Sequence, residues 1–229
     1  MEAIILAGGF GTRLQQVVSD VPKPMAPINN VPFLAYILNY LAKYNITHVV
    51  LAVGYKKDII INYFGDKYKN MNIDYSIEDT PLLTGGAIKK AISKCKEKNI
   101  FIINGDTYFD VNLAKLMEQH LSTNANFTIA VKEMTDFNRY GTVKIDKYNR
   151  VIGFEEKKYY AQGYINGGIY CIKNNILEKI AKNAFSFEKD YMEKHYAIDK
   201  TLAFYSEGYF IDIGIPSDYQ KAQNDFKNL

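Results

Sequence analysis

The sequence has no tryptophan, only two cysteines and only three histidines among its 229 residues. Cys95 and Cys171 lie far apart, among apolar or helical neighbours, which predicts two buried, reduced thiols and not a disulfide framework. His48, His120 and His195 lack the spacing of metal ligands, and no Ser/His/Asp or Cys/His combination is evident. The sequence therefore gives no support for a zinc site or for covalent catalysis.

Long apolar runs and blocks of like charge are also missing. No apolar stretch approaches the roughly 18 residues that a membrane-spanning helix needs, and Glu2 stands where a signal peptide would be basic. The net charge is only +3, and the basic residues are dispersed. We therefore expect a cytoplasmic protein that binds neither nucleic acid nor membrane.

The first half of the chain alternates apolar runs with helical patterns. Such alternation predicts strands and helices that build a parallel sheet with right-handed crossovers. The run at 3–7 is continuously apolar, as in a strand that is covered on both faces. The predicted strands are 3–7, 48–53, 73–77 and 100–103, and the predicted helices are 33–44, 56–64, 85–98 and 112–121.

The pattern changes after about residue 125, where strands follow one another with few helices between them. No linker or repeat separates the halves, so we expect one α/β domain over residues 1–229: a nucleotide-binding half (1–125) and a β-rich half (126–229) for a second substrate. The fold class is a Rossmann-like, mainly parallel mixed sheet flanked by helices. The predicted strands are 127–131, 142–145, 151–155, 168–172 and 203–206, a turn is predicted at 148–149, and the predicted helices are 175–181 and 216–226.

A glycine-rich loop, G-G-F-G-T-R-L at residues 8–14, follows the first apolar run, and Pro22-Lys23-Pro24 comes shortly after. Glycines leave backbone N–H groups open to an anion, and Arg13 and Lys23 add positive charge. The loop lacks the Gly-Lys-Ser/Thr of a Walker A motif and the third glycine of a dinucleotide fingerprint. We therefore expect it to hold a polyphosphate, with an ordinary tight turn as the alternative.

Two acidic residues stand where strands should end in the ligand-binding crevice of an open sheet. Asp106 follows the predicted strand 100–103, and Asp212 is embedded in the apolar run 210–214. Two carboxylates that meet in such a crevice form a site for a hard cation, and Mg²⁺ suits one or two carboxylates together with substrate phosphates. The alternatives are a turn or cap acid for Asp106 and a salt bridge to lysine for Asp212.

These motifs, in this order, resemble the signature of the sugar-phosphate nucleotidyltransferases. The resemblance covers essentially the whole chain and implies a GT-A-like fold that joins a nucleoside triphosphate to a sugar 1-phosphate. It places Arg13, Lys23 and Asp106 in catalysis and Asp106 and Asp212 as ligands of Mg²⁺. The nucleotide-binding residues that it implies are Leu6, Ala7, Gly8, Gly9, Gly11, Thr12, Arg13, Glu78, Leu83, Thr84 and Gly85.

Motifs of the β-rich half are similar to the family's sugar-phosphate site. They are Arg139-Tyr140-Gly141-Thr142, Phe154-Glu155-Glu156-Lys157 and Asn166-Gly167-Gly168-Ile169-Tyr170. The family usually places proline after the lysine of the second motif, whereas this chain has Lys158, so either lysine could hold the sugar phosphate. The sugar-phosphate-binding residues that the resemblance implies are Asn104, Gly105, Gly141, Glu156, Lys157, Asn166 and Gly167.

Glu78 indicates which base is bound, because pyrimidine-using relatives carry glutamine at the matching place. An ionised carboxylate accepts both donors of guanine but would face the carbonyl oxygens of thymine or uracil, so we expect GTP. The chain is most similar to short members that act on a manno-configured heptose 1-phosphate, and mannose 1-phosphate is the next alternative. A thymidylyl- or uridylyltransferase and a non-catalytic nucleotide-sugar sensor stay open, and members of the family often form homodimers.

Overall fold

The structure is a computed structural model that describes residues 1–9, 11, 14, 17–155 and 157–228. Three of the predicted site residues, Thr12, Arg13 and Glu156, lie outside the described residues.

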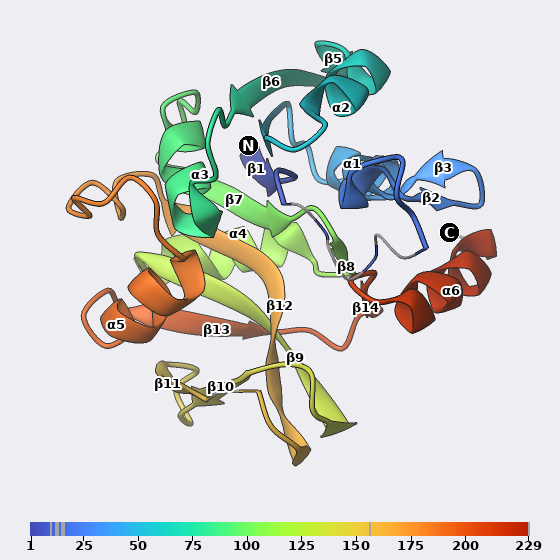
Figure 1. Cartoon of the computed structure of the whole chain (residues 1–229). Coiled ribbons are helices and arrows are strands. Elements are labelled where there is room, and N and C mark those ends of the chain that lie inside the picture. Colours follow the sequence, from blue (N-terminus) through green and yellow to red (C-terminus); the bar gives the residue numbers. More distant parts are fainter. Residues whose placement is uncertain (10, 12–13, 15–16, 156, 229) are drawn as a thin grey trace.

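Parallel strands form the centre of the molecule, as the alternating pattern predicts (Figure 1). In the described part of the chain, ten strands share one sheet, in which β1 pairs in parallel with β4 and β7, and β4 with β6. Leu6 at the end of β1 lies opposite Asn104 at the end of β7, so the carboxyl ends of these strands meet at one edge. The bounds are β1 (Glu2–Leu6), β4 (His48–Val53), β6 (Met71–Ile77) and β7 (Asn99–Asn104).

The second half of the chain extends this sheet with antiparallel strands. The long strand β12 pairs with β7 on one side and with β9 on the other, so strands of both halves share the sheet. Both long strands exceed their predicted lengths, and they run out together as a ribbon beyond the sheet (Figure 1). One domain for the whole chain stays a prediction. The bounds are β9 (Phe127–Phe137), β10 (Thr142–Ile145), β11 (Val151–Glu155), β12 (Tyr160–Lys173) and β13 (Thr201–Tyr205).

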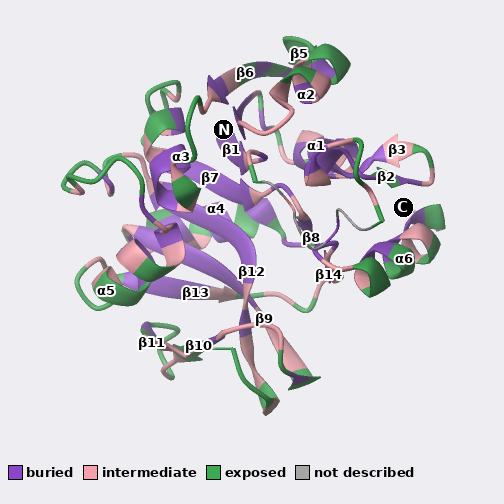
Figure 2. Ribbon diagram, viewed as in Figure 1, coloured by how far each residue is buried: buried purple, intermediate pink, exposed green. Residues whose placement is uncertain are grey.

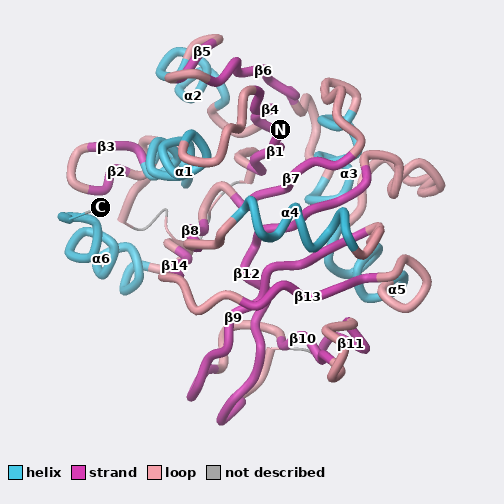
Figure 3. The backbone as a smooth tube through the Cα atoms, turned by 180° about the vertical axis from the view of Figure 1, so that it is seen from behind, coloured by secondary structure: helices cyan, strands magenta, loops and turns pink. Residues whose placement is uncertain are grey.

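Helices cover both faces of the sheet, because alternate residues of each strand point to opposite faces. Ala3 and Ile5 belong to one buried cluster with residues of α1, α4 and α6, whereas Ile4 belongs to a second cluster with residues of α3. Figures 1 and 3 show α3 on one face and α4 on the other, and Figure 2 shows the central strands buried. The bounds are α1 (Phe33–Ala42), α2 (Lys57–Phe64), α3 (Leu83–Ile92), α4 (Leu113–Ser122) and α6 (Pro216–Asp225).

Short elements complete the fold and bring distant segments together. The pair β8 and β14 joins the segment after β7 to the C-terminal region, with Asp212 opposite Thr107. A six-residue π-helix, η2, leads into the short helix α5 and packs on α3, and it has no counterpart in the predicted pattern. The bounds are η1 (Lys23–Met25), β2 (Pro27–Ile28), β3 (Val31–Pro32), β5 (Lys67–Tyr68), β8 (Thr107–Phe109), η2 (Phe187–Met192), α5 (Glu193–His195), β14 (Phe210–Asp212) and η3 (Phe226–Asn228).

Two of the predicted helices differ from the structure. The predicted helix at 175–181 is wrong, because this stretch forms successive turns, such as those closed by Ile176 N–H on the Lys173 carbonyl and Ile180 N–H on the Leu177 carbonyl. Bonds to the third preceding residue make isolated turns and not an α-helix. The helix predicted at 85–98 ends at Ile92, before the exposed Lys94 and Lys96.

His120 is a buried histidine with a structural role. The ring lies between Thr128 Oγ1, 2.8 Å from Nδ1, and Asn99 Oδ1, 3.1 Å from Nε2. The Asn99 oxygen can only accept, so Nε2 carries the proton and Nδ1 accepts from the threonine hydroxyl. Burial, with a further contribution from Lys173, lowers the pKa of His120 from 6.5 to about 4. The folded state therefore holds this imidazole neutral.

This buried imidazole predicts a loss of stability at acid pH. The unfolded chain protonates His120 near pH 6.5 and the folded chain only near pH 4, so the free energy of unfolding falls across that window. We expect His120→Gln, which keeps the donor to Asn99, to lose up to roughly 3 kcal/mol of this pH dependence. Urea unfolding of both proteins between pH 7 and pH 4 measures it, with the half-buried His195→Gln as control. Parallel curves for wild type and His120→Gln would contradict the assignment.

Candidate active site

A cavity of about 780 Å³ opens at the carboxyl ends of the parallel strands. Its walls come from the glycine-rich loop, the ends of β1 and β7, the segment before α3 and, unexpectedly, η2. Ten of the residues predicted for the site line it: Leu6, Gly8, Gly9, Gly11, Lys23, Glu78, Leu83, Thr84, Asn104 and Asp106.

The glycine-rich loop forms one end of this cavity. Gly11 has a φ of +60°, a conformation that glycine adopts at little cost, and its carbonyl accepts the N–H of Leu14. Gly8, Gly9 and Gly11 all face the cavity, as expected for a loop that presents backbone to an anion. Ala7 does not line the cavity, and its N–H donates to the Ala52 carbonyl.

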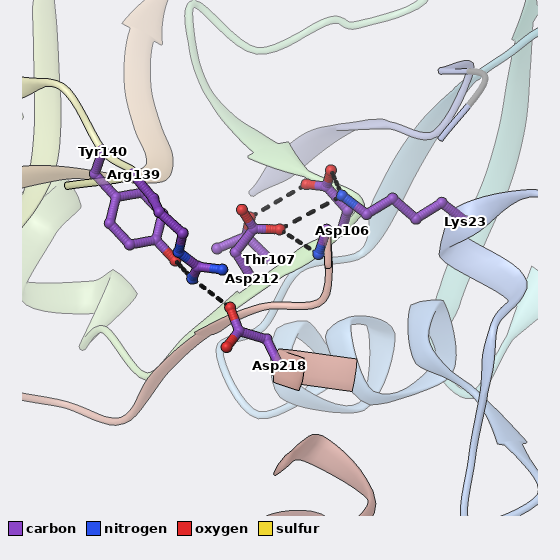
Figure 4. Close-up of polar contacts among 8 residues, drawn as sticks. Lys23, Asp106, Thr107, Arg139, Tyr140, Asp212 and Asp218 are labelled. Carbon is purple, nitrogen blue, oxygen red and sulfur yellow. Dashed lines mark hydrogen bonds and ion pairs between the residues drawn. The ribbon is translucent and has the colours of Figure 1, made fainter. Parts of the chain in front are cut away.

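Lys23 joins the two acids that the sequence singles out. Its Nζ lies 2.5 Å from Asp106 Oδ2 and 3.4 Å from Asp212 Oδ1 (Figure 4). The backbone positions these carboxylates, because Asp106 directly precedes β8 and Asp212 ends β14, which pairs with β8. Segments that are distant in the sequence thus converge on a single ammonium group.

The surroundings of the two carboxylates fit a divalent cation. Burial and the charge of Asp106 raise the pKa of Asp212, and Lys23 and the N–H of Gly214 oppose this effect. A cation placed between the carboxylates relieves the same repulsion, and oxygen donors suit Mg²⁺. The described residues hold no group of three or more His, Cys, Asp or Glu side chains arranged as metal ligands.

Glu78 lines the same cavity and lies beside the glycine-rich loop, because a Cβ on Gly8 would be 2.8 Å from its Oε1. Its Oε2 accepts the N–H of Leu82 at 3.0 Å, and burial raises the pKa of the carboxyl, opposed by that hydrogen bond and by Lys90. Leu83, just beyond, has a φ of +59° and a side chain that is 57% exposed. A large apolar side chain held exposed and strained at a cavity rim is typical of a ligand contact.

Most of the predicted sugar-phosphate residues lie beyond the cavity lining. Asn104 does line it, whereas Gly105, Gly141, Lys157, Asn166 and Gly167 do not. Asn166 Nδ2 donates to Tyr170 Oη at 2.8 Å, and its Oδ1 accepts the N–H of Gly168. Lys157 is exposed.

The Arg139-Tyr140 pair lies on the far side of Asp212 from Lys23 (Figure 4). Arg139 forms an ion pair with Asp218 of α6 and donates to Tyr140 Oη at 2.9 Å. Burial and the charge of Asp212 raise the pKa of Tyr140 to about 12. This pair therefore connects the turn before β10 with the surroundings of Asp212.

The sequence interpretation missed Ser186 and Glu188, which line the cavity beside Thr84. It also assigned Gly85 to the nucleotide, whereas the Gly85 N–H donates to the Phe185 carbonyl at 2.9 Å, outside the lining. Gly85 and Gly86 indicate that another segment packs closely on the start of this helix, but nothing in the sequence shows that the segment is 183–188.

Comparison with known proteins agrees with this geometry. The sequence is 53% identical over 229 residues to the D-glycero-alpha-D-manno-heptose 1-phosphate guanylyltransferase of Aneurinibacillus thermoaerophilus, which covers 100% of this chain and 99% of that protein. It is 47% identical over 220 residues to the enzyme of the same name from Campylobacter jejuni, at 96% and 97% coverage. The crystal structure of HddC from Yersinia pseudotuberculosis complexed with GMP-PN matches with a TM-score of 0.90 and 40% identity, covering 99% of each chain.

The chain belongs to the nucleotidyl transferase family, which it matches over residues 2–228. The resemblance drawn from the glycine-rich loop and its companion motifs is thereby confirmed, and so is the fold class.

Because Lys23 contacts both acids, the loss of its ammonium group should destabilise the protein, and a bound metal ion should compensate for that loss. We expect Lys23→Met to leave two repelling carboxylates and to lower the melting temperature by roughly 2–6 °C in EDTA. Mn²⁺ should then restore more stability to the variant than it adds to wild type, since a ligand that binds only the folded state stabilises it. Thermal unfolding with EDTA and with Mn²⁺ measures both effects, and the partly exposed Lys57→Met is the control. A variant that responds to Mn²⁺ as wild type does would contradict the prediction.

Proposed function

We propose that this protein transfers a guanylyl group from GTP to D-glycero-α-D-manno-heptose 1-phosphate, giving GDP-heptose and pyrophosphate. The observation that carries the proposal is the single cavity lined by the glycine-rich loop, Lys23, Asp106 and Glu78. The two relatives named as heptose 1-phosphate guanylyltransferases, each matched over nearly its whole length, support the choice of substrate.

The reaction needs positioning and charge neutralisation more than proton transfer. The nucleophile is a phosphate oxygen of the sugar 1-phosphate, and because the second pKa of a phosphate monoester is about 6, this oxygen is already ionised near neutral pH. A general base is therefore unnecessary, and among the described residues that line the cavity there is no histidine. In-line attack at the α-phosphorus forms the new P–O bond and expels pyrophosphate.

The residues that line the cavity have different roles in this proposal. The backbone of Gly8, Gly9 and Gly11 faces the β- and γ-phosphates, and Lys23 lies against the reacting phosphates. Arg13, which lies outside the described residues, is assigned by resemblance to the leaving pyrophosphate. Asp106 and Asp212 would hold Mg²⁺, which neutralises charge on the α-phosphate and on the incoming phosphate when it is bound.

Recognition of the base and of the sugar rests on the remaining residues. Ionised Glu78 accepts the two donors of guanine, and the exposed Leu83 covers the base. On the sugar side, Asn104, Gly141, Asn166 and Lys157 stay assigned by resemblance. Lys158 extends over the ring of Tyr160, with Nζ 5.2 Å from its centroid, which favours Lys157 for the phosphate.

Location and assembly stay predictions. Among the described residues, none of the helices combines the length and the apolar character that crossing a bilayer requires. We propose a cytoplasmic enzyme that binds GTP and a sugar 1-phosphate, with no nucleic-acid partner. A homodimer is implied by resemblance alone.

Pyrophosphate release tests the proposed function directly. We expect release from GTP with heptose 1-phosphate, and less with mannose 1-phosphate, because only the heptose carries the additional exocyclic carbon. The measurement uses purified protein with Mg²⁺, each nucleoside triphosphate and a panel of sugar 1-phosphates. Release with UTP or dTTP would overturn the base assignment, faster turnover of mannose 1-phosphate would overturn the sugar, and nucleotide-sugar binding without any release would indicate a sensor.

Glu78 makes the use of GTP depend on pH. Because burial raises the pKa of Glu78, the carboxyl takes up a proton at a higher pH than an ordinary glutamate does, and the protonated form can no longer accept both guanine donors. We expect the KM for GTP to rise as the pH falls, and Glu78→Gln to raise the KM by about tenfold or more and to lose this dependence. Initial rates at varied GTP concentration, from mildly alkaline to mildly acidic pH, measure it. The exposed Glu118→Gln is the control, and an unchanged preference for GTP in Glu78→Gln would sink the assignment.

A further inference from the structure

The segment 183–188 reaches the cavity because the first turn of helix α3 contains two glycines, Gly85 and Gly86. A Cβ on Gly85 would lie 2.2 Å from the ring of Phe185, and one on Gly86 would lie 2.1 Å from the Asn183 carbonyl oxygen. The N–H groups of both glycines point to the Phe185 carbonyl, and the Phe185 N–H donates to the Leu82 carbonyl. The start of α3 therefore lets this segment pack closely against it, and this packing places Ser186 and Glu188 in the cavity wall.

Two hydroxyl groups hold the Glu188 carboxylate in place. Oε2 accepts from Thr84 Oγ1 at 2.6 Å and from Ser186 Oγ at 2.9 Å. Each hydroxyl oxygen also accepts a backbone N–H, Thr84 from Phe187 and Ser186 from Lys189, so each hydroxyl proton is directed at Glu188. Among the described contacts, no hydrogen bond engages Oε1.

The charge of Glu188 decides which part of a substrate it can face. In the described part of the chain it has no ion pair, although it lines the same cavity as Lys23. A carboxylate without a cation repels phosphate and accepts hydrogen bonds from hydroxyl groups. The phosphates therefore belong at the Lys23 end, and a polyol belongs beside Glu188.

The neighbours of Glu188 indicate which polyol this is. Tyr170 of β12 is fully buried, and its pKa is raised by burial and then by the charge of Glu188, which places the carboxylate near the phenol. Tyr170 Oη accepts from Asn166, in the half that is expected to hold the sugar. Glu188 thus lies between the nucleotide-binding helix α3 and the sugar-binding strand β12.

We propose that Glu188 is a specificity-determining residue, which accepts hydrogen bonds from hydroxyl groups of the sugar 1-phosphate. This inference rests on the proposed function. Thr84 and Ser186 act as positioning residues, which fix the carboxylate so that its second oxygen faces the sugar.

Kinetics of Glu188→Gln test the proposal. The variant keeps the shape of the side chain and loses the charge, so we expect the KM for the sugar 1-phosphate to rise about tenfold to a hundredfold. The KM for GTP should change less than about threefold, because the base and phosphates lie elsewhere. Glu193→Gln, an exposed glutamate of the neighbouring helix α5, is the matched control and should behave as wild type. Thr84→Val should raise the same KM to a smaller extent.

Analogues that lack single sugar hydroxyl groups sharpen the test. The KM of wild type should rise most with the analogue that lacks the hydroxyl bound by Glu188. The KM of Glu188→Gln should be little higher for that analogue than for the complete sugar. An unchanged KM for the sugar 1-phosphate in folded Glu188→Gln would overturn the proposal, and a rise confined to GTP would assign the carboxylate to the ribose instead. Wild-type turnover separates the two proposals, because activity with another sugar overturns the heptose assignment alone and absence of any turnover overturns both.

Discussion

The contact of one ammonium group with two carboxylates is the interaction on which the rest of the site depends. Lys23 lies 83 residues before Asp106 and 189 before Asp212 in the sequence, yet its Nζ touches both side chains. The short pair of β8 and β14 holds the acids side by side, and this pair exists because the chain returns to the sheet edge after β13. Without a cation at this point, two partly buried carboxylates would repel each other, and a divalent cation held between them would relieve that repulsion.

The cavity is lined by groups of both charges. Lys23 and the glycine-rich loop are assigned to the phosphates in the proposed function, whereas Glu78 and Glu188 face the cavity without an ion pair among the described residues. A nucleotide and a sugar phosphate are both divided in the same way, into an anionic part and a part rich in hydrogen-bond donors. A site with this polarity orients both substrates before the reaction, and orientation is a large share of what an uncomplicated phosphoryl transfer requires.

The local sequence pattern was sufficient to predict much of the fold and part of the site. The continuous apolar runs predicted β1 and β4 because a strand that is buried on both faces has no polar positions, and the strand ends predicted that Asp106 would face the crevice. The long strands β9 and β12 exceeded their predicted lengths because their outer parts are half exposed and lack a clear apolar run. Glu188 could not be predicted, because it lies in a π-helix that follows the stretch 183–185 packed against Gly85 and Gly86, and no local propensity encodes such a contact.

Because segment 183–188 is anchored on α3, its cavity-facing residues can be exchanged while the segment stays in place. The segment is held through backbone groups, through the space that two glycines leave and through the buried rings of Phe185 and Phe187, and none of these anchors is the side chain of Glu188. With the proposed role of Glu188, substitutions at the cavity-facing positions of the segment would change the choice of sugar and leave the contacts to the phosphates and to the base unchanged. A fold built in this way can acquire new acceptor substrates by exchanging a few neighbouring residues and keep one chemistry throughout.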